Sequence, residues 1–386
     1  MPRTIVAGLD IGTSAIRLVV LEGGQETKTP RLLAQVKKES RGLRRGYITN
    51  FEETLANLRE VVREAERQAK VPLKSVFLGL GGITLEAKTS DGQISVSKAD
   101  LEISDNEVKR VIEASEQNLG DMTNRRLVHI IPLSFKLDGH KILGRPEGLK
   151  GNRLEVKTLF IHCLNQHLQD LIRVTEAAGL AIEDVVAAPI AASLPTITPA
   201  QKVAGCILAN IGSQTTSVIT FEEGIPVALK VLPIGANDVT NDIALVLRVS
   251  IEEAERMKLD PNYAITVKRK LDEIIEARLI DMFELIENHL KKIGRSGLLP
   301  AGIVIIGGGA HVDDMEKIAK DTLRLPVKVF DPLTDPYLKS QMKDSAWSVT
   351  YGLCLHGLNV ETNDSLNDRF KKVSGRLFQW FKEFWP

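Results

Sequence analysis

The chain has 386 residues, which is long enough for two or more domains, and its 50 Lys and Arg residues balance 50 Asp and Glu residues. A neutral body gives no electrostatic reason to expect a nucleic-acid partner, and we predict none. No run of eighteen apolar residues occurs, so we expect no segment that crosses a bilayer. The start of the chain lacks a secretory pattern, and its three isolated cysteines form no C-x-x-C pair, which favours a cytoplasmic protein with reduced thiols.

Strands and helices alternate in the first part of the chain. The pattern predicts two strands around a glycine turn, a helix and a short buried strand, at Thr4–Asp10, Ile16–Glu22, Phe51–Gln68 and Val76–Leu80. The pattern of residues 83–163 predicts a compact α+β insertion. There we expect four strands and one helix with a Ser104/Glu107 capping box, at Ile83–Lys88, Gln93–Val96, Leu127–Leu137, Leu154–Cys163 and Ser104–Asn118.

A second alternating series follows the insertion. It starts with a helix at Asn165–Gly179 and a strand–turn–strand unit from Val203. Further helices and one strand are expected at Ala236–Leu247, Ile251–Lys258, Val267–Ile293, Gly302–Ile306 and Ala346–Leu358. The alternation predicts α/β domains built on mixed sheets.

The last twenty-one residues carry an amphipathic pattern. Apolar residues spaced by three and four form one helical stripe: Leu366, Phe370, Val373, Leu377, Phe378, Trp380, Phe381, Phe384 and Trp385. The other face carries Arg369, Lys371, Lys372, Arg376 and Lys382. Such a helix could dock on the protein's own core, but clustered aromatic residues opposite a basic face favour a membrane surface with anionic lipids.

One nine-residue pattern occurs twice. The segment Leu9–Arg17 returns as Ala209–Ser217, each with an apolar strand, an Asp or Asn, a glycine-containing tight turn with hydroxyls, and a further strand. Two matching hairpins two hundred residues apart predict two related lobes that face each other across a cleft.

The residues of these hairpins suit phosphate. A tight glycine turn lets backbone N–H groups point at an anion, and hydroxyls add donors at Thr13, Ser14, Ser213, Thr215 and Thr216. Asp10 could hold a hydrated Mg²⁺ beside phosphates, and Arg17 could contact a phosphate oxygen. Either hairpin alone could be an ordinary turn, but the pair favours a nucleotide site. Neither a P-loop nor a G-x-G-x-x-G motif is present.

Two further segments could complete such a site. A buried strand ends in Gly307, Gly308 and Gly309, where a flat base could approach the backbone. Glu255 and Lys258 lie three apart on one predicted helix face. They could hold a ribose or adenine or form a surface ion pair, and in isolation the spacing favours the ion pair.

Together these segments resemble the phosphate-1, phosphate-2 and adenosine motifs of the actin/Hsp70/sugar-kinase superfamily. Within it the whole chain is similar to the FtsA family of bacterial cell-division proteins. The similarity also includes Pro233–Gly235, Thr240–Ala244, Ile274–Arg278, His129–Pro132, Asp138-Gly139 and Gly151–Val156. The resemblance implies nucleotide contacts by Asp10, Gly12, Thr13, Ser14, Arg17, Asn210, Gly212, Ser213, Gln214, Thr215, Thr216, Gly235, Glu255, Lys258, Gly307, Gly308 and Gly309.

The resemblance also implies an actin-like two-lobed α/β fold. Subdomain 1A would comprise 1–82 and 164–201 with a closing helix at about 346–358, the inserted 1C domain 83–163, subdomain 2A 202–235 and 301–345, and subdomain 2B 236–300. A linker at 359–365 would precede the amphipathic helix at 366–386.

The function that this resemblance implies is a peripheral adaptor on the inner face of the cytoplasmic membrane at the septum. It would bind ATP and Mg²⁺ between the lobes, form filaments with itself, tether FtsZ polymers and contact later division proteins through 1C. The FtsZ C-terminal peptide would dock on 2B, with Arg278, Lys291, Lys292 and Arg295 as candidate cations. Each could equally be a solvated helix residue.

The second hairpin departs from the superfamily pattern. Asn210 stands where most members have Asp, and Gln214 stands where most have Gly. The usual acidic residue before a proline is also absent at Ala188-Pro189. Asn cannot act as a base or carry the charge that orders a metal and an attacking water. We therefore assign no catalytic residue and expect at most a weak ATPase.

Three alternatives share the superfamily core. A PilM-like component of type IV pilus assembly would not need a membrane-targeting tail. A metabolic kinase would need a catalytic Asp near the second hairpin and a sugar pocket, and an Hsp70-like ATPase would need a following substrate domain. The sequence shows neither the catalytic Asp with a sugar pocket nor a following substrate domain. The amphipathic tail disfavours the PilM-like alternative.

Overall fold

Two five-stranded sheets of identical topology form the body of the molecule. The computed structural model describes residues 4–23, 30–97, 100–260, 263, 265–335 and 337–364. The first sheet has the order β11-β6-β1-β2-β3, with β1 Thr4–Ile11, β2 Ala15–Gly23, β3 Arg31–Glu39, β6 Ser75–Leu80 and β11 Ala181–Ala187. The second has the order β14-β13-β12-β15-β16, with β12 Cys206–Ile211, β13 Thr216–Glu222, β14 Ile225–Leu232, β15 Ile303–Ile306 and β16 Val327–Val329.

The pairing within the two sheets is the same strand for strand. In each sheet the first three strands along the chain pair antiparallel, each with the next. The first of them also pairs parallel with a fourth strand, which pairs parallel with a fifth. The repeated hairpin therefore belongs to a duplication of the whole lobe. This confirms the actin-like two-lobed fold that the sequence implied.

Helices pack on both sheets, and one apolar cluster extends from the first lobe into the second. Helices α1 (Phe51–Ala69), α3 (Asn165–Ala177), α4 (Ala188–Thr196) and α10 (Ser348–Asp364) surround the first sheet. Helices α6 (Ala236–Leu247), α7 (Ile251–Leu259), α8 (Lys268–Lys292) and α9 (Met315–Leu323) belong to the second lobe. The largest apolar cluster joins the first lobe to one face of the second sheet, and a second cluster lies on the other face. The lobes are therefore held together by continuous packing.

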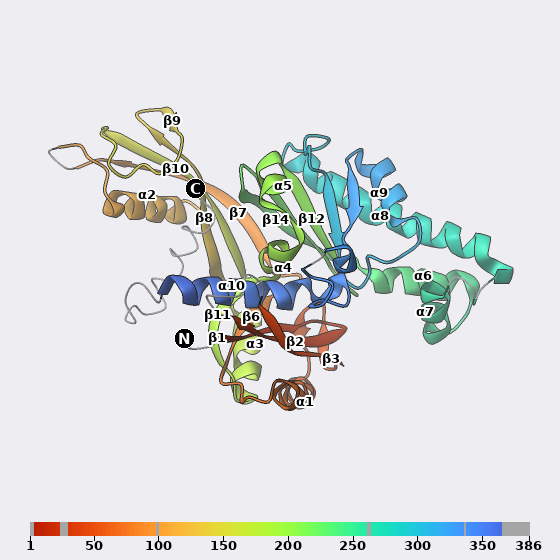
Figure 1. Ribbon diagram of the computed structural model, residues 1–386. Coiled ribbons are helices and arrows are strands. Elements are labelled where there is room, and N and C mark those ends of the chain that lie inside the picture. The colour runs from red at the N-terminus through yellow and green to blue at the C-terminus, as the bar shows by residue number, and fades with distance from the viewer. Residues whose placement is uncertain are drawn as a thin grey trace.

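The insertion is a separate α+β unit with its own apolar core. It comprises β7 (Glu86–Ser95), α2 (Asp105–Gln117), β8 (Arg125–Leu137), β9 (His140–Ile142) and β10 (Arg153–Leu164), with the sheet order β7-β10-β8-β9. It lies at the opposite end of the molecule from α6 and α7 (Figure 1). The predicted capping box is confirmed, because Glu107 Oε2 accepts a hydrogen bond of 3.1 Å from the Ser104 backbone N–H.

Most predicted elements are confirmed to within a few residues, but three differ. The two strands expected at Ile83–Lys88 and Gln93–Val96 form the single strand β7, because Gly92 is a close packing point rather than a turn. A Cβ there would lie 2.4 Å from the Val111 carbonyl oxygen of α2. Val203 lies in a short helix, α5 (Pro199–Ala204), and not in a strand.

The third difference concerns the end of the body. Helix α10 continues past Leu358 to Asp364, through most of the expected linker. The amphipathic helix predicted for 366–386 lies outside the described residues. Among the described residues, no helix is long and apolar enough to span a bilayer.

Helix α10 packs on its neighbours through glycines. A Cβ on Gly352 would lie 1.8 Å from the Ala191 carbonyl oxygen of α4, and a Cβ on Gly8 of β1 would lie 2.3 Å from the Thr350 carbonyl oxygen. A helix at this distance has no room for a methyl group at either contact.

We therefore predict that Gly352→Ala destabilises the protein, although the same change in an ordinary helix interior stabilises it by about 1 kcal/mol. Overpacking against a backbone atom should lower the free energy of unfolding by about 3 kcal/mol, measured by urea denaturation. Gly294→Ala is the control, because no atom lies within 4 Å of a Cβ there and only its positive φ of 70° is strained. Equal stability of Gly352→Ala and the wild type would contradict the close packing.

Candidate functional site: a cleft between two glycine turns

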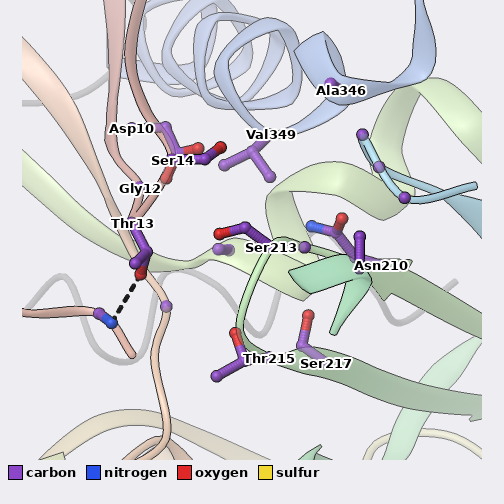
Figure 2. Close-up of a pocket in the computed structure, with 18 of the residues that line it drawn as sticks. Asp10, Gly12, Thr13, Ser14, Asn210, Ser213, Thr215, Ser217, Ala346 and Val349 are labelled. Carbon is purple, nitrogen blue, oxygen red and sulfur yellow. Dashed lines mark hydrogen bonds between the residues drawn. The ribbon is translucent and has the colours of Figure 1, made fainter. Parts of the chain in front are cut away.

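A cavity of about 370 Å³ lies between the lobes, where the two hairpin turns face each other (Figure 2). Most of the residues predicted to contact a nucleotide line it: Asp10, Gly12, Thr13, Ser14, Arg17, Asn210, Gly212, Ser213, Thr215, Glu255, Lys258, Gly307, Gly308 and Gly309. Gln214, Thr216 and Gly235 do not line it. The fold thus brings together segments from four separate parts of the chain.

The two turns have equivalent local geometry. The Gly12 N–H donates to the Ala15 carbonyl oxygen at 3.2 Å, and the Gly212 N–H donates to the Thr215 carbonyl oxygen at 2.9 Å. In both turns a Cβ on the glycine would lie 2.9 Å from that same carbonyl oxygen. Each turn therefore needs glycine, which leaves the following backbone free to face the cavity.

Asp10 and Arg17 form a charged pair on the first hairpin. They are directly opposite each other in the β1–β2 register. Burial raises the pKa of the Asp10 carboxyl, and the Arg17 guanidinium opposes that shift. The guanidinium lies 5.9 Å from the centre of the Trp347 ring, and its buried Nε has no hydrogen-bond partner among the described residues. A buried donor without a protein acceptor suits an anionic ligand.

The three glycines after β15 serve different purposes. Gly307 has a φ of 100°, and a Cβ there would lie 2.4 Å from Asn210 Oδ1. A Cβ on Gly309 would lie 2.7 Å from Ile211 Cγ2. These two glycines allow the end of β15 to pack against β12, whereas nothing lies within 4 Å of a Cβ on Gly308. Gly308 leaves open space in the wall of the cavity, where a flat group could approach.

Glu255 and Lys258 form an ion pair in the wall of the cavity rather than on the open surface. The Lys258 side chain is only 5% exposed. Its Nζ donates to Glu255 Oε2 at 2.6 Å, to Thr240 Oγ1 at 2.7 Å and to the Ala236 carbonyl oxygen at 3.3 Å. Lys258 therefore joins α7 to the start of α6, while the Glu255 side chain keeps 42% exposure beside the cavity.

Thr216 and Gly235 support the second turn from behind. Thr216 is fully buried, and its Oγ1 donates to the Ile234 carbonyl oxygen at 2.8 Å, so its hydroxyl is not available to a ligand. A Cβ on Gly235 would lie 2.6 Å from the Ser213 carbonyl oxygen, which explains why glycine precedes α6. The first backbone N–H groups of α6 then bond the turn, from Ala236 to the Gly212 oxygen and from Asn237 to the Ser213 oxygen.

Gln214 points away from the cavity, across to the first lobe. Its Oε1 accepts a hydrogen bond of 2.8 Å from the Arg45 backbone N–H. The side chain that made the second turn unusual is therefore a contact between the lobes.

Sequence reasoning missed His167, which lines the cavity and is 1% exposed. Its Nε2 bonds the Gly46 carbonyl oxygen at 3.0 Å, and its Nδ1 lies 2.7 Å from Thr84 Oγ1. Because a carbonyl can only accept, Nε2 carries the hydrogen and Nδ1 accepts from the hydroxyl. Burial lowers the pKa of the ring, which favours this neutral form. One histidine near the start of a helix gave no signal that it would face a cleft.

The four candidate cations for a peptide do not form one free cluster. Arg278 bonds Asp242 of α6, with Nη2 2.9 Å from Oδ1, and lies 3.3 Å from Asp281. Arg295 pairs with Glu222 at the end of β13. The remaining cations, Lys291 and Lys292, are exposed, with Lys291 Nζ 3.7 Å from Glu287. Two of the four thus pair with carboxylates of the second lobe itself.

Carboxylates are scarce in the cavity. Of the residues that line it, only Asp10 and Glu255 are acidic. The part of the chain that the structure describes contains no group of three or more His, Cys, Asp or Glu residues placed to hold a metal. A Mg²⁺ at Asp10 would therefore need phosphate and water oxygens for its other positions, as is usual for this ion.

Comparisons with known proteins define first the fold class. The solved structure of a PilM-PilN type IV pilus biogenesis complex matches with a TM-score of 0.69 and 19% identity, over 92% of this chain and 99% of that chain. MreB5 of Spiroplasma citri bound to ADP matches with a TM-score of 0.53 and 14% identity, over 94% of this chain and 99% of that chain. At these identities the likeness is one of fold: the chain has the fold of the actin-like ATPases.

Sequence comparison then identifies the family. The family model described as "Cell division protein FtsA" matches residues 207–352, and the model of the SHS2 domain inserted in FtsA matches residues 82–162. The chain is 30% identical to the cell division protein FtsA of Bacillus subtilis, over 85% of this chain and 79% of that protein. It is 28% identical to that of Borreliella burgdorferi over the full length of both. The chain belongs to the FtsA family of cell division proteins.

We predict that the two neighbouring threonines of the second turn have separable roles. Thr216→Val leaves the buried Ile234 oxygen without its donor and should lower the free energy of unfolding by about 1–3 kcal/mol. Thr215→Val, at a cavity-facing position, should change it by less than about 0.5 kcal/mol. Thermal and urea unfolding of both variants measure this difference. A larger loss from Thr215→Val than from Thr216→Val would contradict the placement of the two hydroxyls.

Proposed function

We propose that this member of the FtsA family binds ATP with Mg²⁺ in the cleft, assembles with itself, and tethers FtsZ polymers to the inner face of the cytoplasmic membrane. The observation that carries the nucleotide part is the pair of equivalent glycine turns facing one cavity from two lobes. The tether part is supported by the family and by the amphipathic sequence at 366–386.

The chemistry of the cavity suits a nucleoside triphosphate. Backbone N–H groups of both turns, the hydroxyls of Thr13, Ser14 and Ser213, and the buried Nε of Arg17 are donors for phosphate oxygens. The open wall at Gly308 leaves space for a base. The MreB5 structures, which share the fold, are described as bound to ADP and to AMPPNP.

Hydrolysis in this cleft should be slow. Asn210 occupies the position where a carboxylate would order the attacking water, and amide groups are poor bases. His167 cannot replace it, because both ring nitrogens are engaged with Gly46 and Thr84. We propose that ATP serves assembly rather than rapid turnover.

Gly308→Asp should abolish ATP binding measured by calorimetry in the presence of Mg²⁺. The position has open space, so the new carboxylate enters the cavity without a clash in the protein, and it repels the phosphates or occupies the space of the base. Gly308→Ala is the control and should bind within a few-fold of the wild type with an unchanged melting temperature. If Gly308→Asp binds ATP as the wild type does, the ligand does not occupy this cavity.

The tether requires a membrane site and a peptide site. The apolar stripe of Leu366, Phe370, Val373, Leu377, Phe378, Trp380, Phe381, Phe384 and Trp385 would lie in the headgroup region. Burial at about 1.5–3 kcal/mol for each large side chain is ample for reversible binding before the cost of ordering.

Since Arg278 and Arg295 are paired with carboxylates, we propose that Lys291 and Lys292 contribute most to attraction of the FtsZ peptide. The insertion would contact later division proteins and a neighbouring subunit.

Recruitment of a fluorescent FtsZ C-terminal peptide to anionic vesicles tests both sites at once. The wild type should carry the peptide to floated vesicles with ATP and Mg²⁺. Trp380→Glu should abolish recruitment by releasing the protein from the vesicles, because it places a charge in the apolar stripe, whereas Trp380→Phe should retain it. The double reversal Lys291→Glu/Lys292→Glu should leave the protein on the vesicles but reduce the bound peptide.

The matched control for the peptide site is Lys268→Glu/Lys270→Glu, at the exposed opposite end of α8. Undiminished flotation of the Trp380→Glu variant would refute the membrane helix. A peptide that binds both lysine double variants equally would place its site elsewhere. A wild type that binds ATP but ignores the peptide would favour a PilM-like adaptor, which shares the fold.

A further inference from the structure

A small hairpin of the first lobe reaches the edge of the cleft. Its strands are β4 (Leu43–Arg44) and β5 (Tyr47–Ile48), and we refer to residues 43–48 as the strap. At its tip Arg45 has a φ of 51° and Gly46 a φ of 88°, the positive pair of a type I′ turn. A Cβ on Gly46 would lie 2.5 Å from the Gly82 Cα, so the tip is pressed against the first lobe.

Every polar backbone atom at the tip of the strap is used by a contact outside the strap. The Arg45 oxygen accepts from the Ile83 N–H at 3.2 Å, and the Gly46 oxygen accepts from His167 Nε2 at 3.0 Å. The Gly46 N–H donates to Thr13 Oγ1 at 2.9 Å, drawn as the dashed line in Figure 2. These three contacts come from the first lobe.

The fourth contact comes from the second lobe. The Arg45 N–H donates to Gln214 Oε1 at 2.8 Å, over a sequence separation of 169 residues. The strap is thereby fastened to both hairpin turns, to the first through the Thr13 hydroxyl and to the second through the Gln214 amide. Because Thr13 Oγ1 accepts from the strap, its single hydrogen is left to donate into the cavity.

Gln214 lies in the wall between two spaces. It does not line the cavity of the glycine turns, but it lines a second cavity of about 280 Å³ with Arg44, Arg45, Asn237, Asp238 and Asn241. Its side-chain oxygen is engaged with the strap and not with the cavity that the turns line. Its side chain connects the strap of the first lobe to the hairpin turn of the second lobe.

We propose that Gln214 is a latch: its amide oxygen fastens the strap of the first lobe to the second hairpin turn and so slows the release of nucleotide from the closed cleft. The proposal rests on the proposed nucleotide binding and adds a positioning residue to that site. It also gives a reason for a long polar side chain in a turn where the wider superfamily usually has glycine. Opening the lobes breaks one hydrogen bond that glycine could not make.

The test is the dissociation rate of a fluorescent ATP analogue, measured by stopped-flow chase with Mg²⁺ on the full-length chain. Gln214→Leu keeps the size of the side chain but removes the acceptor, and should accelerate release by about 3–10-fold, the range for one partly exposed hydrogen bond. Gln214→Glu keeps the acceptor and places a negative charge in a cavity lined by Arg44, Arg45 and a single carboxylate, Asp238. Its release should be as slow as that of the wild type or slower.

These two variants separate the latch from the other roles that Gln214 could have. A purely space-filling role predicts normal release from Gln214→Leu, and a direct phosphate contact predicts weakened binding by Gln214→Glu through charge repulsion. Either result overturns the latch. In a chain of 386 residues the loss of one such hydrogen bond is a small part of the total unfolding entropy and enthalpy, so both variants should melt within about 2 °C of the wild type.

Gln166→Leu, on the exposed face of α3, is the control and should release the analogue at the wild-type rate. Failure of the wild type itself to bind the analogue would remove the nucleotide function, and with it the latch. Binding by the wild type with equal release from all Gln214 variants would remove the latch alone.

Discussion

The central constraint of this molecule is that two glycine turns on separate sheets must face the same small space. Each turn is closed by its own backbone hydrogen bond, from Gly12 or from Gly212, and neither tolerates a Cβ. The turns could not stay opposed if the lobes moved freely. The apolar cluster shared by the first lobe and one face of the second sheet holds them in position. The cavity is therefore a consequence of how the lobes pack.

Helix α10 connects this packing to the end of the chain. Val349 in the first turn of α10 lines the cavity. Gly352 allows the helix to pack closely against α4, and the helix continues to Asp364. Seventeen residues of α-helix span about 25 Å, so Asp364 at the end of α10 lies about that far from the start of the helix. Helix α10 thus runs as one continuous helix from the cavity to the end of the described chain.

Local chemistry made much of the fold and site predictable. The duplicated hairpin, the α6 helix at Ala236–Leu247 and the Ser104 capping box depend on neighbouring residues, and the structure confirms them. Which of two adjacent hydroxyls faces a cavity depends on strand register, so Thr215 and Thr216 could not be distinguished. The single strand β7 was predicted as two strands, because the packing partner of Gly92, α2, approaches only in the folded insertion.

The roles of residues whose partners lie far away in the chain could not be predicted from the sequence. The bond from Gln214 to Arg45 and the pairing of Arg295 with Glu222 each join segments that are far apart in the chain. His167 acquires its place through Gly46 and Thr84, which come from two other elements. Pattern and spacing selected most of the residues that line the cavity, but the contacts that join the two lobes around it required the fold.

The most direct test of this account is hydrogen–deuterium exchange of the full-length protein with and without ATP and Mg²⁺. If one nucleotide is held between the lobes, amide exchange should slow together at residues 12–15, 212–215 and 307–309, because all three segments line the same cavity. Bound ATP that protects the turn of only one lobe, or none of these segments, would contradict a shared site.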